Sequence, residues 1–214
     1  MEQFEIERKA LIKELIEMGI KDKAVLEAIN KVPRHFFVPG DLLKEAYANY
    51  PLPIPGMQTI SQPYTVAFML EALELKRGQK VLEIGTGSGW NAALIAHLVG
   101  IRGKVITTEI VPELINFSKQ NIKKFGLKNI KIIETDGSQG YAKEAPYDRI
   151  IVTAACLEIP IPLVEQLKER GIIVAPVGPS YNQEMIKARK VKGRLKRKSL
   201  GFFAFVPLTG KYGY

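Results

Sequence analysis

The stretch KVLEIGTGSGWNAALIAHLVG, residues 80–100, decides the fold. It starts as a short apolar run of the kind that forms a buried strand, and it ends as an apolar helical segment. Gly85, Gly87 and Gly89 stand between the two. Glycines at this place allow a tight turn into the helix and let a ligand approach the backbone closely. The spacing is G-x-G-x-G, with Trp90 where a dinucleotide fingerprint has its third glycine, so the loop alone leaves a nucleotide-type ligand and simple packing equally open.

Strand and helix patterns alternate from this loop to residue 178. Apolar runs predict further strands at 104–110, 131–137, 147–155 and 172–178, and helical patterns occupy 91–100, 112–126 and 162–171. Short apolar strands separated by helices are typical of a parallel sheet that is covered on both faces. The sequence therefore predicts an α/β fold with a doubly wound, mostly parallel sheet.

Helical and antiparallel segments flank this core. On the N-terminal side, helices are predicted over 2–18, over 22–30 with Asp22 as its N-cap, and over 65–75. On the C-terminal side, EMIKARKVKGRLKRKSLG, residues 184–201, predicts two strands around a turn at Lys192-Gly193. The whole chain is expected to form one domain with a helical extension and an antiparallel edge.

The composition restricts the class of protein. The 214 residues are 46% hydrophobic and 25% charged, which allows a sizeable core. A single cysteine excludes a disulfide framework, and the two distant histidines, His35 and His97, argue against a metal centre. The N-terminus lacks the apolar run of a signal peptide, and no stretch approaches the roughly 18 apolar residues of a membrane span. We therefore expect a cytoplasmic protein without a bound metal.

The positive charge is concentrated in one segment. Residues 187–199, KARKVKGRLKRKS, contain eight Lys or Arg and no acid, and they account for almost all of the net charge of +9. The segment is either a phosphate-binding stripe or a solvated hairpin whose lysines protect an edge strand. The second interpretation is favoured, because the segment has no aromatic residue on which a base could stack.

A proline-rich stretch precedes the core. PLPIPGMQTISQPY, residues 51–64, contains four prolines, so it is expected to be a long extended loop rather than a helix or a central strand. Long loops in compact domains are usually functional or disordered, and the apolar residues Leu52, Ile54 and Ile60 argue against disorder. A packed loop that offers hydroxyls and amides is suited to a binding site.

Acidic residues follow two of the predicted strands. Glu109 ends the second strand, where a carboxylate can accept hydrogen bonds from both hydroxyls of a ribose. Asp136-Gly137 ends the third strand, where an adenine amine could be bound. Together with the glycine loop, these residues follow the rule that ligands bind at the carboxyl ends of parallel strands.

The order of these motifs resembles that of a known enzyme class. The chain resembles class I S-adenosylmethionine-dependent methyltransferases in four successive motifs. These are E-x-G-x-G-x-G, then Glu109, then Asp136-Gly137 and then YDRIIVTAA. The flanking sequences VPRHFFVP, AYANYPLPIPGMQTISQPYTVAFMLEAL and FVPLTG resemble those of the protein-L-isoaspartate (D-aspartate) O-methyltransferase family. The resemblance extends from about residue 5 to residue 213, and QTISQP is its most discriminating motif.

The resemblance implies a protein repair enzyme with a Rossmann-like methyltransferase fold. Such an enzyme transfers the methyl group of S-adenosylmethionine to the α-carboxylate of L-isoaspartyl residues in damaged proteins and peptides. The parts implied are a helical extension (1–50), an active-site loop (51–64), a cofactor-binding core (78–180) and a C-terminal hairpin with a substrate-side strand (181–214). We expect a monomer that requires neither nucleic acid nor a membrane.

The resemblance also assigns site residues. It implies Ser61 as the active-site residue and Thr59 and Val206 as substrate-binding residues. The cofactor-binding residues that it implies are Gln58, Ile60, Glu83, Gly85, Thr86, Gly87, Ser88, Gly89, Glu109, Asp136, Gly137 and Thr209. Because a carboxylate nucleophile is already ionised at neutral pH, no strong base is required, and Ser61 is expected to orient it through a hydrogen bond.

Alternatives remain open for the residue and for the function. Ser61 could instead be the N-cap of the helix after Pro63. The chain could be an RNA, DNA or other small-substrate methyltransferase with the basic hairpin as a phosphate grip, although VTAACLEIP lacks the aromatic-proline motif expected for a flipped base. It could also be a non-enzymatic module that keeps only the cofactor fold.

Overall fold

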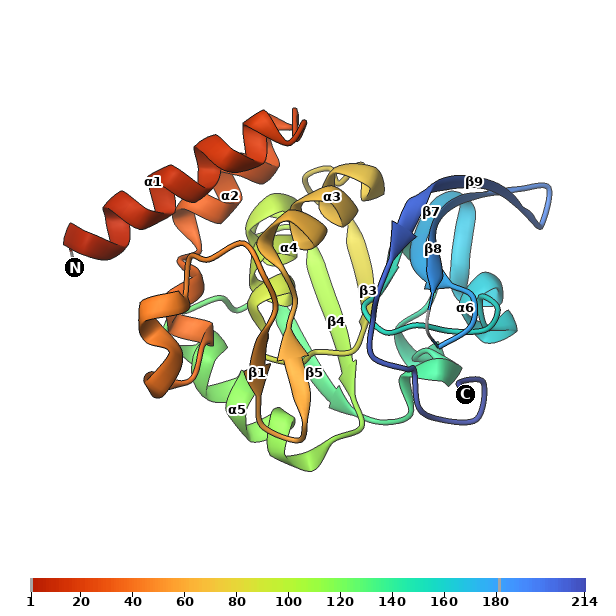
Figure 1. Cartoon of the computed structure of the whole chain (residues 1–214). Coiled ribbons are helices and arrows are strands. Elements are labelled where there is room, and N and C mark those ends of the chain that lie inside the picture. The colour runs from red at the N-terminus through yellow and green to blue at the C-terminus, as the bar shows by residue number, and fades with distance from the viewer. Residues whose placement is uncertain (1, 181) are drawn as a thin grey trace.

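A seven-stranded sheet forms the centre of the protein in the computed structural model, which describes residues 2–180 and 182–214 (Figure 1). Its strands are β3 (Lys80–Ile84), β4 (Lys104–Glu109), β5 (Ile130–Glu134), β6 (Tyr147–Val152), β7 (Leu167–Val177), β8 (Gln183–Val191) and β9 (Arg194–Phe203). They lie in the order β5-β4-β3-β6-β7-β8-β9, parallel from β5 to β7 and antiparallel from β7 to β9. The predicted α/β class and antiparallel edge are confirmed.

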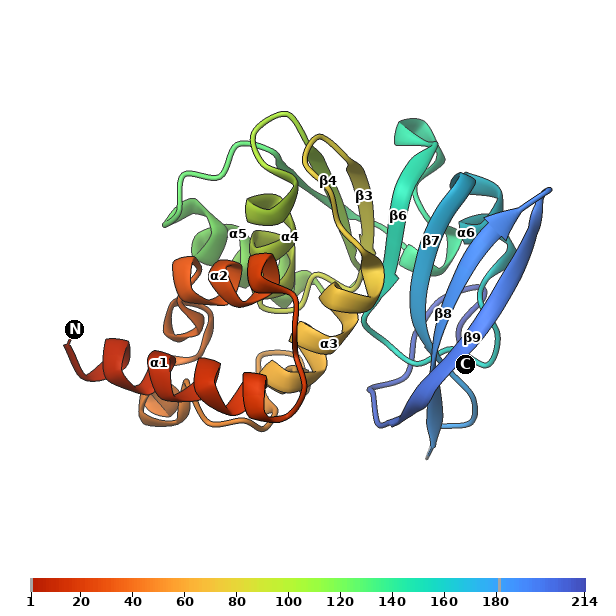
Figure 2. The same ribbon diagram turned by 90° about the horizontal axis from the view of Figure 1, so that it is seen from above.

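Helices cover both faces of this sheet (Figure 2). They are α1 (Glu2–Glu17), α2 (Lys23–Lys31), α3 (Pro63–Leu73), α4 (Trp90–Val99), α5 (Pro112–Lys123) and α6 (Ile161–Gln166). Consecutive strand residues belong to different cores, since Val81 lies in the core to which α1 to α5 contribute, whereas Leu82 lies in the core that contains Leu163 of α6. Burial of both strand faces explains why these strands are continuously apolar in the sequence.

One predicted cap and one predicted turn are present as expected. The Asp22 side chain accepts hydrogen bonds from the amides of Ala24 and Val25 at 2.8 and 3.3 Å, which makes it the N-cap of α2. At the turn between β8 and β9, Lys192 and Gly193 have φ values of 51° and 76°. A two-residue turn with both φ values positive matches the twist of a hairpin.

The proline-rich stretch is more regular than an extended loop. It contains two short strands, β1 (Leu52–Ile54) and β2 (Gln58–Ile60), which pair antiparallel with each other. The turn between them is made by Gly56 and Met57, with φ values of 68° and 55°. The prolines are tolerated because β1 has only one paired edge. We call residues 51–61 the β1–β2 hairpin.

The helix predicted over 162–171 ends earlier than expected. α6 stops at Gln166, and residues 167–171 belong to β7 instead. Leu167 is fully buried and pairs with Tyr147 of β6, so tertiary packing overrides the local helical pattern. Arg170 has a φ of 64°, which is incompatible with a continuing helix.

The chain after β9 returns to the centre of the molecule. The amide of Ala155 donates to the Val206 carbonyl and the amide of Leu208 donates to the Ala155 carbonyl, both at 2.7 Å. These bonds place residues 205–209 next to the end of β6, and Figure 1 shows this dark blue segment near the β1–β2 hairpin. No helix among residues 2–180 and 182–214 is long and apolar enough to cross a membrane.

Candidate active site

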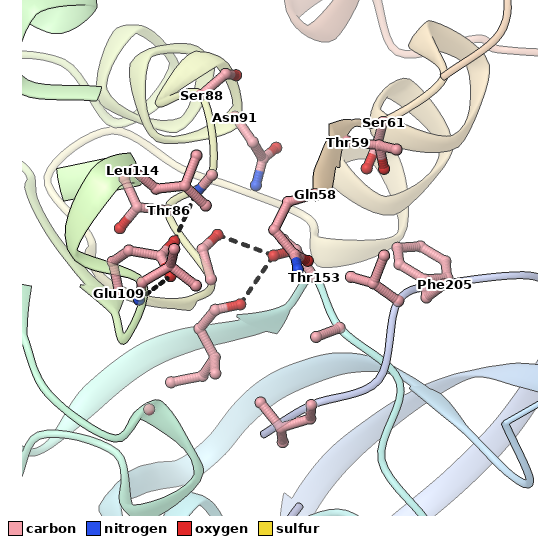
Figure 3. A pocket seen from close by; sticks show the side chains of 18 of the residues that line it. Gln58, Thr59, Ser61, Thr86, Ser88, Asn91, Glu109, Leu114, Thr153 and Phe205 are labelled. Carbon is pink, nitrogen blue, oxygen red and sulfur yellow. Dashed lines mark hydrogen bonds between the residues drawn. The ribbon is translucent and has the colours of Figure 1, made fainter. Parts of the chain in front are cut away.

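A cavity lies at the carboxyl ends of β3, β4 and β6 (Figure 3). The chain continues from β3 to β4 and β5 on one side and places β6 and β7 on the other, so β3 and β6 form a topological switch point. Open α/β sheets bind ligands at such a point. The β1–β2 hairpin and residues 205–209 close the cavity, which therefore has a wall from each end of the chain.

The glycine loop forms one wall of the cavity through backbone conformations that require glycine. Gly85 and Gly87 have φ values of 93° and 53°. A Cβ at Gly85 would lie 2.5 Å from the Thr153 hydroxyl, whereas a Cβ at Gly87 would approach only Ile54, at 3.7 Å. Gly85 is therefore needed for packing, and Gly87 leaves space at the cavity wall.

The Glu109 carboxylate connects the glycine loop to the end of β4. One oxygen accepts a hydrogen bond from the Gly87 amide at 2.9 Å. The other accepts from the amides of Ile110 and Val111 at 2.9 and 3.0 Å. A carboxylate can accept about four hydrogen bonds, so Glu109 keeps acceptor capacity on the side that faces the cavity.

Glu83 lies behind the glycine loop and does not line the cavity. Its carboxyl group is fully buried and accepts hydrogen bonds from the Thr107 hydroxyl and from the Asn91 side-chain amide. Burial raises the pKa of Glu83 to about 8, against the lowering effect of these two donors. The bond to Glu83 fixes the Asn91 amide at the cavity wall and leaves its buried oxygen without a partner among the described residues.

The Asp136 carboxylate also lies outside the cavity. It accepts hydrogen bonds from the amide and hydroxyl of Ser138, from the Gln139 side chain and from the Lys211 amide. Burial would raise the pKa of Asp136, but these donors lower it below the ordinary value. Gly137 does line the cavity, and a Cβ there would meet the Thr108 hydroxyl at 2.5 Å.

The β1–β2 hairpin presents polar side chains on the opposite side of the cavity from Glu109. Figure 3 shows Thr59 and Ser61 beside Phe205, and Glu109 and Thr86 across the opening. The Ser61 hydroxyl makes no hydrogen bond within the part of the chain that the structure describes. The alternative N-cap role of Ser61 is wrong, because Gln62 occupies the N-cap position of α3.

A buried arginine holds this hairpin from behind. The Arg34 guanidinium is fully buried and donates to the carbonyls of Ala46, Tyr50 and Ser61 at 2.8, 3.2 and 3.2 Å. It also lies over the Trp90 ring, 5.5 Å from its centroid. Burial lowers the pKa of Arg34 to about 9, since within residues 2–180 and 182–214 no carboxylate pairs with it. Sequence reasoning assigned no role to Arg34, although a cation in the apolar, proline-flanked motif VPRHFFVP was a signal for one.

The structure brings most of the sequence-predicted site residues to one cavity. Those that line it are Gln58, Thr59, Ile60, Ser61, Gly85, Thr86, Gly87, Ser88, Glu109, Gly137, Val206 and Thr209. Glu83, Gly89 and Asp136 lie behind its walls. Sequence reasoning missed Asn91 and Phe205, which line the cavity. Asn91 follows the glycine loop outside its motif, and Phe205 begins the motif FVPLTG, of which only Val206 and Thr209 were predicted to be site residues.

One family model and two curated relatives from that family are similar to this chain. The sequence model of the protein-L-isoaspartate(D-aspartate) O-methyltransferase family matches residues 6–213. Protein-L-isoaspartate O-methyltransferase 2 of Archaeoglobus fulgidus is 48% identical over 99% of this chain and 96% of its own. The protein-L-isoaspartate O-methyltransferase of Dictyoglomus turgidum is 49% identical over 99% of this chain and 95% of its own.

A solved structure from Plasmodium falciparum is similar over nearly the whole fold. It is described as a protein-L-isoaspartate O-methyltransferase in complex with S-adenosyl-L-homocysteine. It is 29% identical, with a TM-score of 0.84 that covers 94% of this chain and 98% of that one. The similarity therefore includes the sheet, the helical extension and the antiparallel edge.

Proposed function

The chain belongs to the protein-L-isoaspartate(D-aspartate) O-methyltransferase family, and from this premise we propose which residues bind the two substrates. It is a repair enzyme that transfers the methyl group of S-adenosylmethionine to L-isoaspartyl residues of damaged proteins. One observation carries the proposed assignment: the unbonded Ser61 hydroxyl and the Glu109 carboxylate face one cavity from opposite sides. We further propose that a single copy suffices, since one chain supplies all of these walls.

The cavity fits S-adenosylmethionine at the glycine-loop side. Glu109 has acceptor capacity for ribose hydroxyls, and Gly87 leaves room for a ligand at the backbone. Asn91 lines the same side of the cavity, where its bond to Glu83 fixes the side-chain amide. We assign the cofactor to Glu109, Gly87, Asn91 and the neighbouring lining residues. When bound, the sulfonium supplies an activated methyl group.

The hairpin side of the cavity is suited to position a carboxylate. The nucleophile is an α-carboxylate that is ionised at neutral pH, so the protein needs to orient it and to exclude water rather than remove a proton. Ser61 and Thr59 present hydroxyl donors, and Phe205 and Val206 supply an apolar wall next to them. We propose that Ser61 donates a hydrogen bond to the substrate carboxylate and fixes its direction of approach.

Replacement of Ser61 tests this assignment. We expect Ser61→Ala to lower kcat on an isoaspartyl peptide about 10- to 100-fold, because positioning is lost while no proton transfer is removed. The affinity for S-adenosylmethionine, measured by calorimetry, should stay within a few-fold. Ser61→Thr keeps the hydroxyl and should fall between wild type and alanine. An alanine variant with full kcat would remove Ser61 from the mechanism.

Replacement of Arg34 tests how the hairpin is held. Arg34→Lys should lower the free energy of unfolding by about 3 kcal/mol or more, because one ammonium cannot reach three separated carbonyls and buried groups lose their partners. Turnover per folded molecule should also fall, since the Ser61 backbone is released. Urea unfolding measures the free energy of unfolding, and methyl transfer to an isoaspartyl peptide measures the turnover.

Arg149 offers a matched control for this change. It is also buried and donates to backbone carbonyls, those of Leu73 and Glu74, but it does not line the cavity. Arg149→Lys should therefore lose stability while turnover per folded molecule stays near that of wild type. A turnover per folded molecule that stays at the wild-type value in Arg34→Lys would mean that Arg34 acts only on global stability.

A further inference from the structure

A second groove lies on the outer side of α3. Val66 and Met69 of this helix line the active-site cavity, whereas Tyr64, Phe68 and Glu74 face the groove. The opposite walls of the groove are Met18, Gly19, Ile20, Lys187, Arg189, Lys196, Lys198 and Leu200. One helix therefore separates the two depressions, and none of the residues assigned above to the transfer reaction lines the outer one.

Four cations gather on one side of this groove. Lys187 pairs directly across the β8–β9 ladder with Lys198, and Arg189 pairs with Lys196. Like charges in directly opposite positions destabilise a hairpin. Glu74 forms ion pairs with Lys187 and Arg189, whereas the exposed Lys196 and Lys198 have no ion pair within residues 2–180 and 182–214. The groove thus holds two uncompensated positive charges.

The floor of the groove is aromatic. The Phe68 ring lies between those of Tyr64 and Phe203, at centroid distances of 5.9 and 5.2 Å. Lysines that only keep an edge strand in solution would not need an aromatic floor beside them. Apolar surface next to cations fits a polypeptide with mixed apolar and acidic side chains. A phosphate backbone fits less well, because it offers no apolar group to cover Phe68.

The groove begins close, along the chain, to residues of the active-site cavity. Tyr64 stands three residues after Ser61, and Phe203, whose ring contacts Phe68 of the groove, stands two residues before Phe205 of the cavity wall. With a rise of 1.5 Å per residue, α3 carries the groove about 15 Å from Tyr64 to Glu74. An extended peptide spans that distance with about five residues.

We propose that this groove binds an acidic segment of the damaged protein, about five to eight residues from its isoaspartyl residue. The proposal rests on the proposed position of the substrate carboxylate at Ser61. Carboxylates of the segment pair with Lys196 and Lys198, and its apolar side chains pack on Phe68. The basic hairpin then selects substrates by charge, at a distance from the reacting atoms.

Matched peptides test the proposal. All peptides share one sequence around the isoaspartyl residue. Four Glu or four Gln are placed five to eight residues away from the isoaspartyl residue, on its N-terminal side in one pair of peptides and on its C-terminal side in the other. For one of the two placements, we expect the Glu peptide to have a KM roughly 3- to 10-fold lower than its Gln twin, as two exposed ion pairs would give. The kcat values should agree, and the difference should shrink in high salt.

Two double variants locate the effect. Lys196→Gln/Lys198→Gln should abolish the Glu–Gln difference and leave the Gln peptide unchanged. Lys119→Gln/Lys123→Gln removes the same charge from exposed positions on α5 and should preserve the difference. Equal KM values for both peptides in wild type, or a difference that survives the first variant, would overturn the proposal.

Two further outcomes are separable from these. Inhibition by random single-stranded RNA that disappears with Lys196→Gln/Lys198→Gln, without any Glu–Gln difference, would assign the groove to nucleic acid and overturn the proposal. Methylation of the Gln peptide depends on the active-site cavity and not on ion pairs in the groove, because this peptide carries no added acidic residues. Loss of that methylation would contradict the assignment of the cavity, whereas an absent Glu–Gln difference contradicts only the groove.

Discussion

A peptide that contains one L-isoaspartyl residue should be methylated by this protein, and its L-aspartyl twin should remain at background. The two peptides have the same atoms, but the carboxylate leaves the chain from a different carbon. Displacement of a reacting group by about 1 Å can cost about 100-fold in rate, so we expect kcat/KM to differ by more than 100-fold. Transfer of a labelled methyl group to the two peptides under identical conditions measures the ratio.

The physical reason for this discrimination is the rigidity of the cavity wall. Ser61 lies on a hairpin whose backbone is bonded to a buried guanidinium, so the hydroxyl cannot follow a displaced carboxylate. RNA serves as the negative control for the alternative substrate class. Equal labelling of both peptides, or labelling of RNA alone, would contradict the function assigned to the family member described here.

Gly87→Val should remove measurable binding of S-adenosylmethionine, with an expected loss of roughly 1000-fold or more. Gly87 has a φ of 53°, and its amide donates to Glu109. A β-branched residue there must either keep its side chain at the cavity wall or move the loop away from Glu109. Both outcomes remove the ligand site, and calorimetry with S-adenosylhomocysteine measures the loss.

Gly126→Val provides the matched control. Gly126 has a similar φ of 61°, is exposed, and has no atom within 4 Å of an added Cβ. The control variant therefore carries comparable backbone strain without touching the cavity, and it should bind the ligand as wild type does. If both variants lost affinity equally, or if Gly87→Val bound normally, the assignment of the cofactor to this loop would be wrong.

Features fixed by local sequence were predictable. The glycines at 85–89 and Glu109 occur in a strand–loop–helix pattern, and the sheet rule places them at one edge without knowledge of the tertiary structure. The Lys192-Gly193 turn and the Asp22 cap are likewise local, because turn and cap chemistry depends on neighbouring residues.

Features that depend on distant contacts were not predictable. Arg34 bonds to carbonyls 12 to 27 residues away, so its role emerges only when the three segments meet. Asn91 is positioned by its bond to the buried Glu83, which was predicted to bind the cofactor itself and instead lies behind the cavity wall. Residues 167–171 looked helical, and pairing of Leu167 with β6 made them a strand.

The cavity is closed by segments from both ends of the chain, and this has a consequence for biosynthesis. Ser61 and Thr209 face the same space, yet the ribosome adds nearly 150 residues between them, which takes roughly 7–30 seconds at about 5–20 residues per second. A nascent chain that has reached the end of β6 contains the glycine loop and Glu109 but has no Phe205 or Val206. The glycine-loop wall of the cavity is therefore synthesised long before the wall made by residues 205–209, and the enzyme becomes competent for repair only after its C-terminal segment has docked beside β6.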